Sequence, residues 1–193
     1  MINQLIIKGF KSFVDKSINF NQLNVLTGLN SSGKSTVIQA LQILSKYSRH
    51  FENPLIEGHG DYKELQNPFS SLPFSINAKY GEHGIICYSP QKENNIHTEE
   101  FPDLIIISAD RYGPLVSIPL LSDCELGSKG ENVIKCIQVH ENDILDKLIT
   151  HPNSEGDTFL YNLRAWLGTI TPGVQFNYDI IDKADTSFSL FNG

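Results

Sequence analysis

Residues 23–36 read LNVLTGLNSSGKST. This stretch contains the spacing G-x4-G-K-[ST], which runs from Gly28 to Ser35. The short apolar run over residues 23–27 predicts a buried central strand. After Lys34, apolar residues recur at helical spacing, which predicts a helix that ends near residues 48–50. Strand, glycine-rich loop and helix, in that order, are the context in which this spacing forms a phosphate-binding loop, the P-loop or Walker A motif.

Each residue type in this loop suits the binding of a nucleoside triphosphate. Gly28 and Gly33 permit backbone angles that turn N–H groups toward an anion, and the helix N-terminus adds further free N–H groups. Lys34 supplies a positive charge for the β- and γ-phosphates, and we predict it as the catalytic residue. The Ser35 hydroxyl is placed to bind Mg²⁺, and Thr36 lies near the α-phosphate. The loop therefore predicts ATP and Mg²⁺ as ligands, held by Asn30, Ser31, Ser32, Gly33, Lys34, Ser35 and Thr36.

Composition and charge limit the other functions. A chain of 193 residues suffices for one domain with a core. The net charge of −7 argues against a surface that wraps nucleic acid, although it allows a local basic patch or DNA contacts made by a partner. No apolar run approaches the roughly 18 residues of a membrane span, and the N-terminus lacks a signal-peptide layout. We therefore expect a cytoplasmic protein with no membrane association.

The remaining chain predicts a mixture of strands and helices. Alternation predicts strands over residues 2–10 and 17–20, and antiparallel strands over 74–80 and 85–88. A further buried strand is expected over residues 103–109. Helices are expected over 131–140 and 158–167, with Trp166 in the core, and a hairpin over 174–181 and 186–191. The three cysteines lack the spacing of a metal or redox site, and no metal ligand other than that for Mg²⁺ is predicted.

Two stretches resemble one branch of P-loop proteins. Residues 6–13, IIKGFKSF, resemble the φ-x-x-F-K-S-F start of the ABC-type ATPases of the SMC, RecF and OLD lineage. Asn30 in the third place of the loop, and its SGKST ending, are typical of the same lineage. Weaker blocks resemble bacterial defence-associated AAA-family ATPases that occur with nucleases, such as the Septu ATPase; they cover residues 59–65, 74–79, 108–114 and 127–131.

The resemblance implies a fold and two further site residues. It implies an α/β fold of P-loop NTPase type: the N-terminal lobe of an ABC-type ATPase head, with an antiparallel β subdomain. Residues 1–193 would form the N-terminal portion of one ATPase domain, with a P-loop core over 1–50 and a β-rich and helical insertion over 51–193. By position, Lys11 and Ser12 would contact the phosphates or the ribose. For Lys11, an ordinary solvated lysine is the alternative.

Two parts of an ABC-type ATPase are missing from these residues. Such enzymes have a signature loop that reaches the partner subunit's ATP, and a Walker B strand that ends in Asp-Glu. The apolar run over residues 104–107 ends instead in SADR. Arg111, at its end, would contact the γ-phosphate or a partner, or would pair with Asp110. We hypothesise an N-terminal fragment, inactive alone, whose other motifs follow residue 193.

The leading functional hypothesis is ATP binding and hydrolysis as the motor or switch of a larger assembly. The resemblance implies a second ATPase head, in a homodimer or higher oligomer, and a nuclease or other effector subunit in anti-phage defence. DNA contact would be made through the assembly. The alternatives are a non-catalytic ATP-sensing module and a DNA-repair ATPase of RecF type. A P-loop kinase or GTPase is disfavoured, because the guanine-reading N-K-x-D motif is absent.

Overall fold

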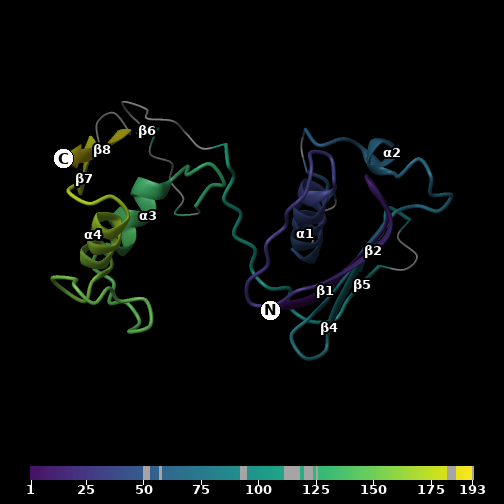
Figure 1. Cartoon of the computed structure of the whole chain (residues 1–193), viewed down its shortest axis with the longest axis horizontal. Coiled ribbons are helices and arrows are strands. Elements are labelled where there is room, and N and C mark those ends of the chain that lie inside the picture. The colour runs from purple at the N-terminus through teal and green to yellow at the C-terminus, as the bar shows by residue number, and fades with distance from the viewer. Residues whose placement is uncertain are drawn as a thin grey trace. The chain divides into compact units, whose positions relative to one another are not determined.

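The computed structural model describes residues 1–49, 53–56, 58–91, 95–110, 118–119, 124, 126–181 and 186–192. These residues belong to two compact units, Met1–Leu104 and Ile105–Gly193 (Figure 1). Each unit is described by itself. Among the described residues, no helix combines the length and the apolarity that crossing a lipid bilayer requires.

The first unit is built on an antiparallel sheet with the strand order β2-β1-β3-β4-β5. Phe10 pairs with Phe13, so that only two residues turn the chain between the first two strands. The sheet confirms the strands predicted over 2–10, 74–80 and 85–88, and it shows that the second strand begins earlier than predicted. The strands are β1 (Ile2–Phe10), β2 (Phe13–Asn19), β3 (Ser75–Tyr80), β4 (Gly84–Tyr88) and β5 (Ile96–His97).

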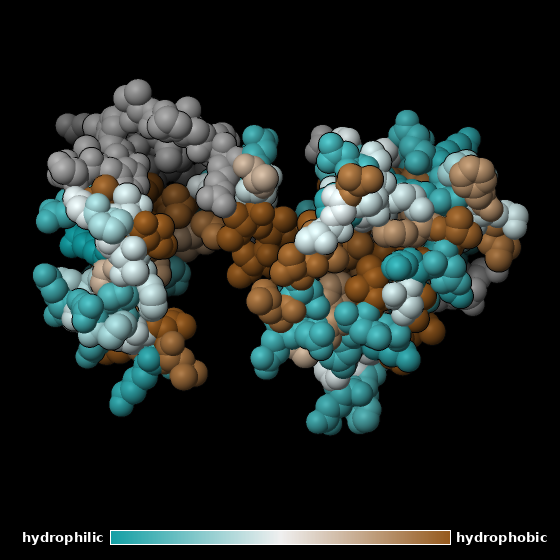
Figure 2. Space-filling view, viewed as in Figure 1, coloured by the Kyte–Doolittle hydropathy of each residue, from teal (hydrophilic) through white to brown (hydrophobic). Residues whose placement is uncertain are grey.

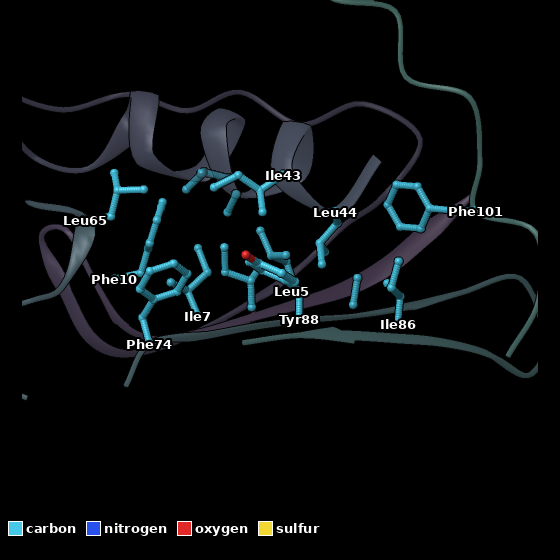
Figure 3. Packing of buried hydrophobic residues seen from close by; sticks show 14 of the residues in the cluster. Leu5, Ile7, Phe10, Ile43, Leu44, Leu65, Phe74, Ile86, Tyr88 and Phe101 are labelled. Carbon is cyan, nitrogen blue, oxygen red and sulfur yellow. The ribbon is translucent and has the colours of Figure 1, made fainter. Parts of the chain in front are cut away.

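Helix α1 (Lys34–Ser48) packs against one face of this sheet and forms the core with it (Figure 3). Leu5 and Ile7 are two residues apart on β1, so both side chains point to the helix, where Ile43 and Leu44 are fully buried. Each such side chain contributes about 1.5–3 kcal/mol by its burial. The predicted helix is confirmed at both ends, and its core attachment fixes the direction in which its N-terminus points.

A short helix that the sequence did not reveal, α2 (Tyr62–Leu65), lies after α1 in the chain. The Asp61 carboxylate accepts hydrogen bonds from the N–H groups of Lys63 and Glu64, and the Glu64 carboxylate accepts one from the Asp61 N–H. This reciprocal capping explains why four residues suffice for a helical turn. Leu65 at its end is fully buried in the core.

Two predicted buried strands are absent, which corrects the sequence analysis. Residues 23–27 form no strand, Leu23 is 83% exposed, and no described residue hydrogen-bonds to their backbone. Residues 103–109 likewise form no strand, and Ile105 is 76% exposed. Figure 2 shows hydrophobic residues at the surface along this second run, whose place is given by Figure 1. A buried strand needs neighbouring strands on both edges, and the described chain supplies none here.

The second unit combines two helices with a small sheet. The helices are α3 (Val133–His140) and α4 (Phe159–Ile170), and the strands are β6 (Ile118–Pro119), β7 (Gln175–Ile181) and β8 (Thr186–Asn192), in the order β6-β8-β7. Ile134, Ile137 and Phe176 form its core. Both predicted helices and the predicted hairpin of β7 and β8 are confirmed.

Trp166 is not a core residue, contrary to the prediction from helical spacing. Leu163 and Leu167 mark the inner face of α4. Because neighbouring residues of a helix point about 100° apart, Trp166 lies beside this face, at its edge. Its ring is exposed and meets His151 edge-on, with the ring centroids 4.6 Å apart. Its indole N–H donates to the Ile149 carbonyl at 3.1 Å.

Candidate nucleotide-binding site

The loop before α1 has the backbone conformation that the glycines predicted. Gly33 is the N-cap residue of α1, with φ 96°, and Gly28 has φ 144°. A Cβ added at Gly33 would lie 2.9 Å from the Cε1 of Phe13, closer still to its Cζ, and 3.0 Å from the Ser12 hydroxyl. Both the backbone angle and the space therefore require glycine at position 33.

The N-terminus of α1 presents free backbone N–H groups. Gly33 offers no side-chain cap, and no acidic residue stands in the first turn. The first bond of the helix runs from the Val37 N–H to the Gly33 carbonyl, at 3.1 Å. The N–H groups of residues 34–36 thus lack intrahelical acceptors, and the positive end of the helix dipole lies beside them. Such an end binds phosphate or carboxylate groups.

The Lys34 ammonium group is held over the loop. Its Nζ donates to the carbonyls of Gly28 and Leu29, at 2.7 Å each, and lies 3.5 Å from the Ser32 hydroxyl. These contacts keep a positive charge beside the N-terminus of α1 while leaving the ammonium exposed.

The turn between β1 and β2 forms one wall of the site. The Ser12 hydroxyl lies 3.4 Å from the Thr36 hydroxyl, and the Phe13 ring stands against Gly33. Together the turn and the loop enclose a hollow of about 340 Å³. This volume is within the range of small-molecule sites, about 300–1,000 Å³. The hollow is lined by Ser12, Asn30, Ser31, Ser32, Gly33, Lys34, Ser35 and Thr36, so that the structure brings together every predicted site residue except Lys11.

Lys11 lies in the same turn but is not among the residues that line the hollow. Its backbone has a φ of 48°, which is unusual for a residue with a side chain. Two hydrogen bonds fix it: its N–H donates to the Leu65 carbonyl at 2.7 Å, and its carbonyl accepts from the Asn67 side chain at 2.6 Å. The nucleotide contact of Lys11 stays a prediction.

Asn67 and Phe13 are positioning residues that the sequence analysis did not identify. Asn67 is buried; besides the bond to Lys11, its N–H donates to the Gly9 carbonyl at 2.8 Å, and its side chain accepts from the Phe69 N–H. It thereby anchors the turn that carries Ser12. No local signal could reveal this role, because Asn67 is 56 residues from Lys11 in the sequence. For Phe13, the place directly after the turn was the available signal.

Asp110 follows the apolar run over residues 104–107. Asp110 pairs with Lys129 at 2.8 Å, and both are in the second unit. Arg111 and its predicted role lie outside the described residues. Among the residues that the structure describes, no group of three His, Cys, Asp or Glu side chains could hold a metal ion.

Comparison with known proteins gives a family and two partial relatives. The family model of the AAA ATPase domain matches residues 1–166. The DNA replication and repair protein RecF of Oenococcus oeni is 30% identical over 83 residues, which are 39% of this chain and 22% of that protein. An ATP/GTP phosphatase of Helicobacter pylori is 43% identical over 51 residues, which are 26% of this chain and 14% of that protein.

The aligned parts span less than a quarter of either relative's length. The relatives therefore support a RecF-like ATPase family without transferring a whole protein's activity. The family model, in contrast, covers most of the chain, including the β1–β2 turn and the complete loop that precedes the N-terminus of α1. On this match, the protein belongs to the AAA ATPase domain family.

Proposed function

We propose that the protein binds ATP with Mg²⁺ in the hollow at the N-terminus of α1 and hydrolyses it. One observation carries the proposal: a loop shaped by two glycines, an uncapped helix N-terminus and the Lys34 ammonium converge on one hollow. The family assignment and the ATP/GTP phosphatase relative support the same chemistry.

The residues divide the work by their position around the hollow. The backbone N–H groups of residues 30–36 receive the phosphates, and Lys34 neutralises charge on the β- and γ-phosphates. The Ser35 hydroxyl would supply one oxygen ligand to Mg²⁺, which prefers oxygen ligands. When bound, Mg²⁺ would neutralise negative charge on the phosphates. Thr36 lies toward the α-phosphate, with Ser12 against it, and Lys11 contacts the phosphates or ribose from the turn.

The proposed assembly goes further than the site. We infer a cytoplasmic ABC-type ATPase head that acts with a second head, in a homodimer or higher oligomer, with ATP between them. ATP binding and hydrolysis between the heads would drive a movement, and an effector such as a nuclease would use it. The setting would be anti-phage defence or DNA repair of RecF type. The RecF relative favours the repair version, and DNA would be contacted through the assembly. The resemblance to the Septu ATPase supports the defence version.

A second candidate, a non-catalytic ATP-sensing module, is favoured by one observation. The apolar run over residues 104–107 is followed by SADR, and no Asp-Glu pair follows it to activate water. In this version ATP orders an interface without turnover.

The test is nucleotide binding and hydrolysis by the purified protein with Mg²⁺ and ATP, with and without Lys34→Ala. We expect the variant to bind ATP at least about tenfold more weakly, because a charge-assisted contact to phosphate is lost. Lys16→Ala, an exposed lysine on β2, is the matched control and should bind as the wild type does. Unchanged binding in Lys34→Ala would contradict the site. Binding without turnover by the wild type would favour the sensing module.

A further inference from the structure

An apolar ridge stands on the surface of the second unit. It consists of Leu148 and Ile149, from the loop over residues 141–158 between α3 and α4, and of Trp166 and Ile170, one turn apart on α4. All four side chains are exposed, Leu148 by 93% and Ile170 by 75%. The Trp166 N–H donates to the Ile149 carbonyl at 3.1 Å, which joins the loop to the helix. Figure 2 shows hydrophobic residues at the surface of this loop.

The loop under the ridge is held by an inner frame of hydrogen bonds. Asp146 accepts from the Leu148 N–H with its side chain, at 2.8 Å, and from the Ile149 N–H with its carbonyl, at 3.0 Å. Asn162, which is fully buried on α4, accepts from the His151 N–H at 2.7 Å and donates to the carbonyls of Gly156 and Thr158. The exposed side chains are therefore presented by an ordered backbone, which lowers the entropic cost of binding a partner.

The charge of the second unit, and of the loop that carries Leu148 and Ile149, indicates the class of partner. Residues 105–193 contain twelve Asp and Glu but only six Lys and Arg, and the loop over 141–158 contains five acidic residues and one lysine. An acidic field of this kind repels nucleic acid and anionic lipid surfaces, and it attracts a cationic chain. Apolar side chains on an ordered acidic surface are complementary to an amphipathic segment that is basic.

We propose that the apolar ridge is a docking surface for a basic amphipathic segment of another protein. Leu148, Ile149, Trp166 and Ile170 pack against its apolar face, and the acidic residues of the loop meet its Lys and Arg side chains. This site lies wholly in the second unit, whereas the hollow at α1 lies in the first. The proposal therefore does not depend on nucleotide binding.

The test uses the complete chain and three synthetic helical peptides of equal length. The first peptide has Leu on one face of the helix and Lys on the opposite face. The second has Glu in place of each Lys, and the third has Ser in place of each Leu. Fluorescence anisotropy at low salt should show binding of the Leu/Lys peptide alone, and added salt should weaken it. The double variant Leu148→Ser/Ile170→Ser should bind this peptide at least about tenfold more weakly, because it removes two of the four apolar side chains of the ridge.

The controls separate this surface from general stickiness. Leu72→Ser, at an exposed leucine of the first unit, should bind as the wild type does. Leu148→Lys changes only a side chain that is almost fully exposed, and it should weaken binding even if the double variant fails to fold. Equal binding of the Glu peptide, or full binding by Leu148→Lys, would overturn the proposal. So would a wild-type dimer that becomes monomeric in Leu148→Lys on light scattering, because the occupant would then be a second copy.

Discussion

Gly33 joins the two parts of the candidate site. It ends the loop with a φ of 96°, and it lets the Phe13 ring approach the first turn of α1. The turn between β1 and β2 can therefore reach the loop, and Ser12 can stand beside Thr36. The position of the helix N-terminus and that of the turn are coupled, because Phe13 packs closely against Gly33.

We expect Gly33→Ala to lose nucleotide binding. The new Cβ would overlap the Phe13 ring, and a residue with a side chain at this φ carries about 1–3 kcal/mol of strain. Isothermal titration with Mg²⁺ and ATP measures the loss. Gly58→Ala is the matched control, since Gly58 is in the same unit, has φ 75° and has no atom within 4 Å of the added Cβ. Equal effects in both variants would show that the contact with Phe13 does not matter.

Cys136 should react slowly with thiol reagents. Burial, followed by its hydrogen bonding to Cys124, raises the pKa of the Cys136 thiol to about 11, from an ordinary value of 9. The reactive form is the thiolate, so at pH 8 the native thiol should react up to about 100-fold more slowly than the unfolded one. The rate should rise as the pH approaches 11. Alkylation followed by peptide mass mapping checks this, and a native rate equal to the unfolded one would contradict it.

At the scale of elements, local patterns were sufficient for helices and for strands that pair with near neighbours. The helical spacing after Lys34 is a property of α1 itself, and the alternation in β1 is likewise local. The buried strands predicted over residues 23–27 and 103–109 were wrong. Apolarity indicates a preference for burial, whereas a strand also needs a partner strand, which is a non-local property. The prediction that Trp166 lies in the core was wrong because a side chain at the edge of an amphipathic face can be either buried or exposed.

The attachment of α1 to the sheet should depend on its buried face. Ile43→Ala leaves a cavity at a fully buried position, and we expect it to lower the free energy of unfolding by about 2–5 kcal/mol. Ile38→Ala, at an exposed isoleucine of the same helix, should change it by less than about 0.5 kcal/mol. Urea unfolding followed by circular dichroism measures both. A small effect at Ile43 would mean that the helix is not seated as described.

The predictability of the site follows the same rule of distance. The contiguous residues 30–36 were predictable, because spacing and flanking elements are enough to specify the loop. Ser12 was available only through the resemblance to the SMC, RecF and OLD lineage, and the structure brings it to the hollow. Asn67 could not be found, since it acts by fixing a turn that lies far from it in the sequence.

At the scale of the molecule, the candidate site belongs to one unit, while the family model spans 1–166 and so includes most of the second. The predicted division into a core over 1–50 and an insertion over 51–193 stays a prediction, although α1, β3 and β4 share one core. Because Ser12 and residues 30–36 all lie in Met1–Leu104, this segment alone should unfold cooperatively and bind ATP.

The measurement on the segment of residues 1–104 is thermal unfolding with and without Mg²⁺ and ATP, since a ligand that binds only the folded state raises the melting temperature. The same segment with Lys34→Ala should show no such rise. A segment that is unfolded while the complete chain binds ATP would show that the second unit is needed for the fold of the first.

The strand order has a consequence for co-translational folding. β1 lies between β2, which directly follows it, and β3, which begins only at Ser75. On the ribosome, the hairpin and the entire loop emerge first, before the strands that complete the floor beneath α1. Until Tyr88 has left the exit tunnel, the nascent helix can pack only on the β1–β2 hairpin, because β3 and β4 are still incomplete. A pause in translation before that point would prolong the exposure of Leu5 and Ile7 to water, and a chaperone could bind these apolar side chains during that time.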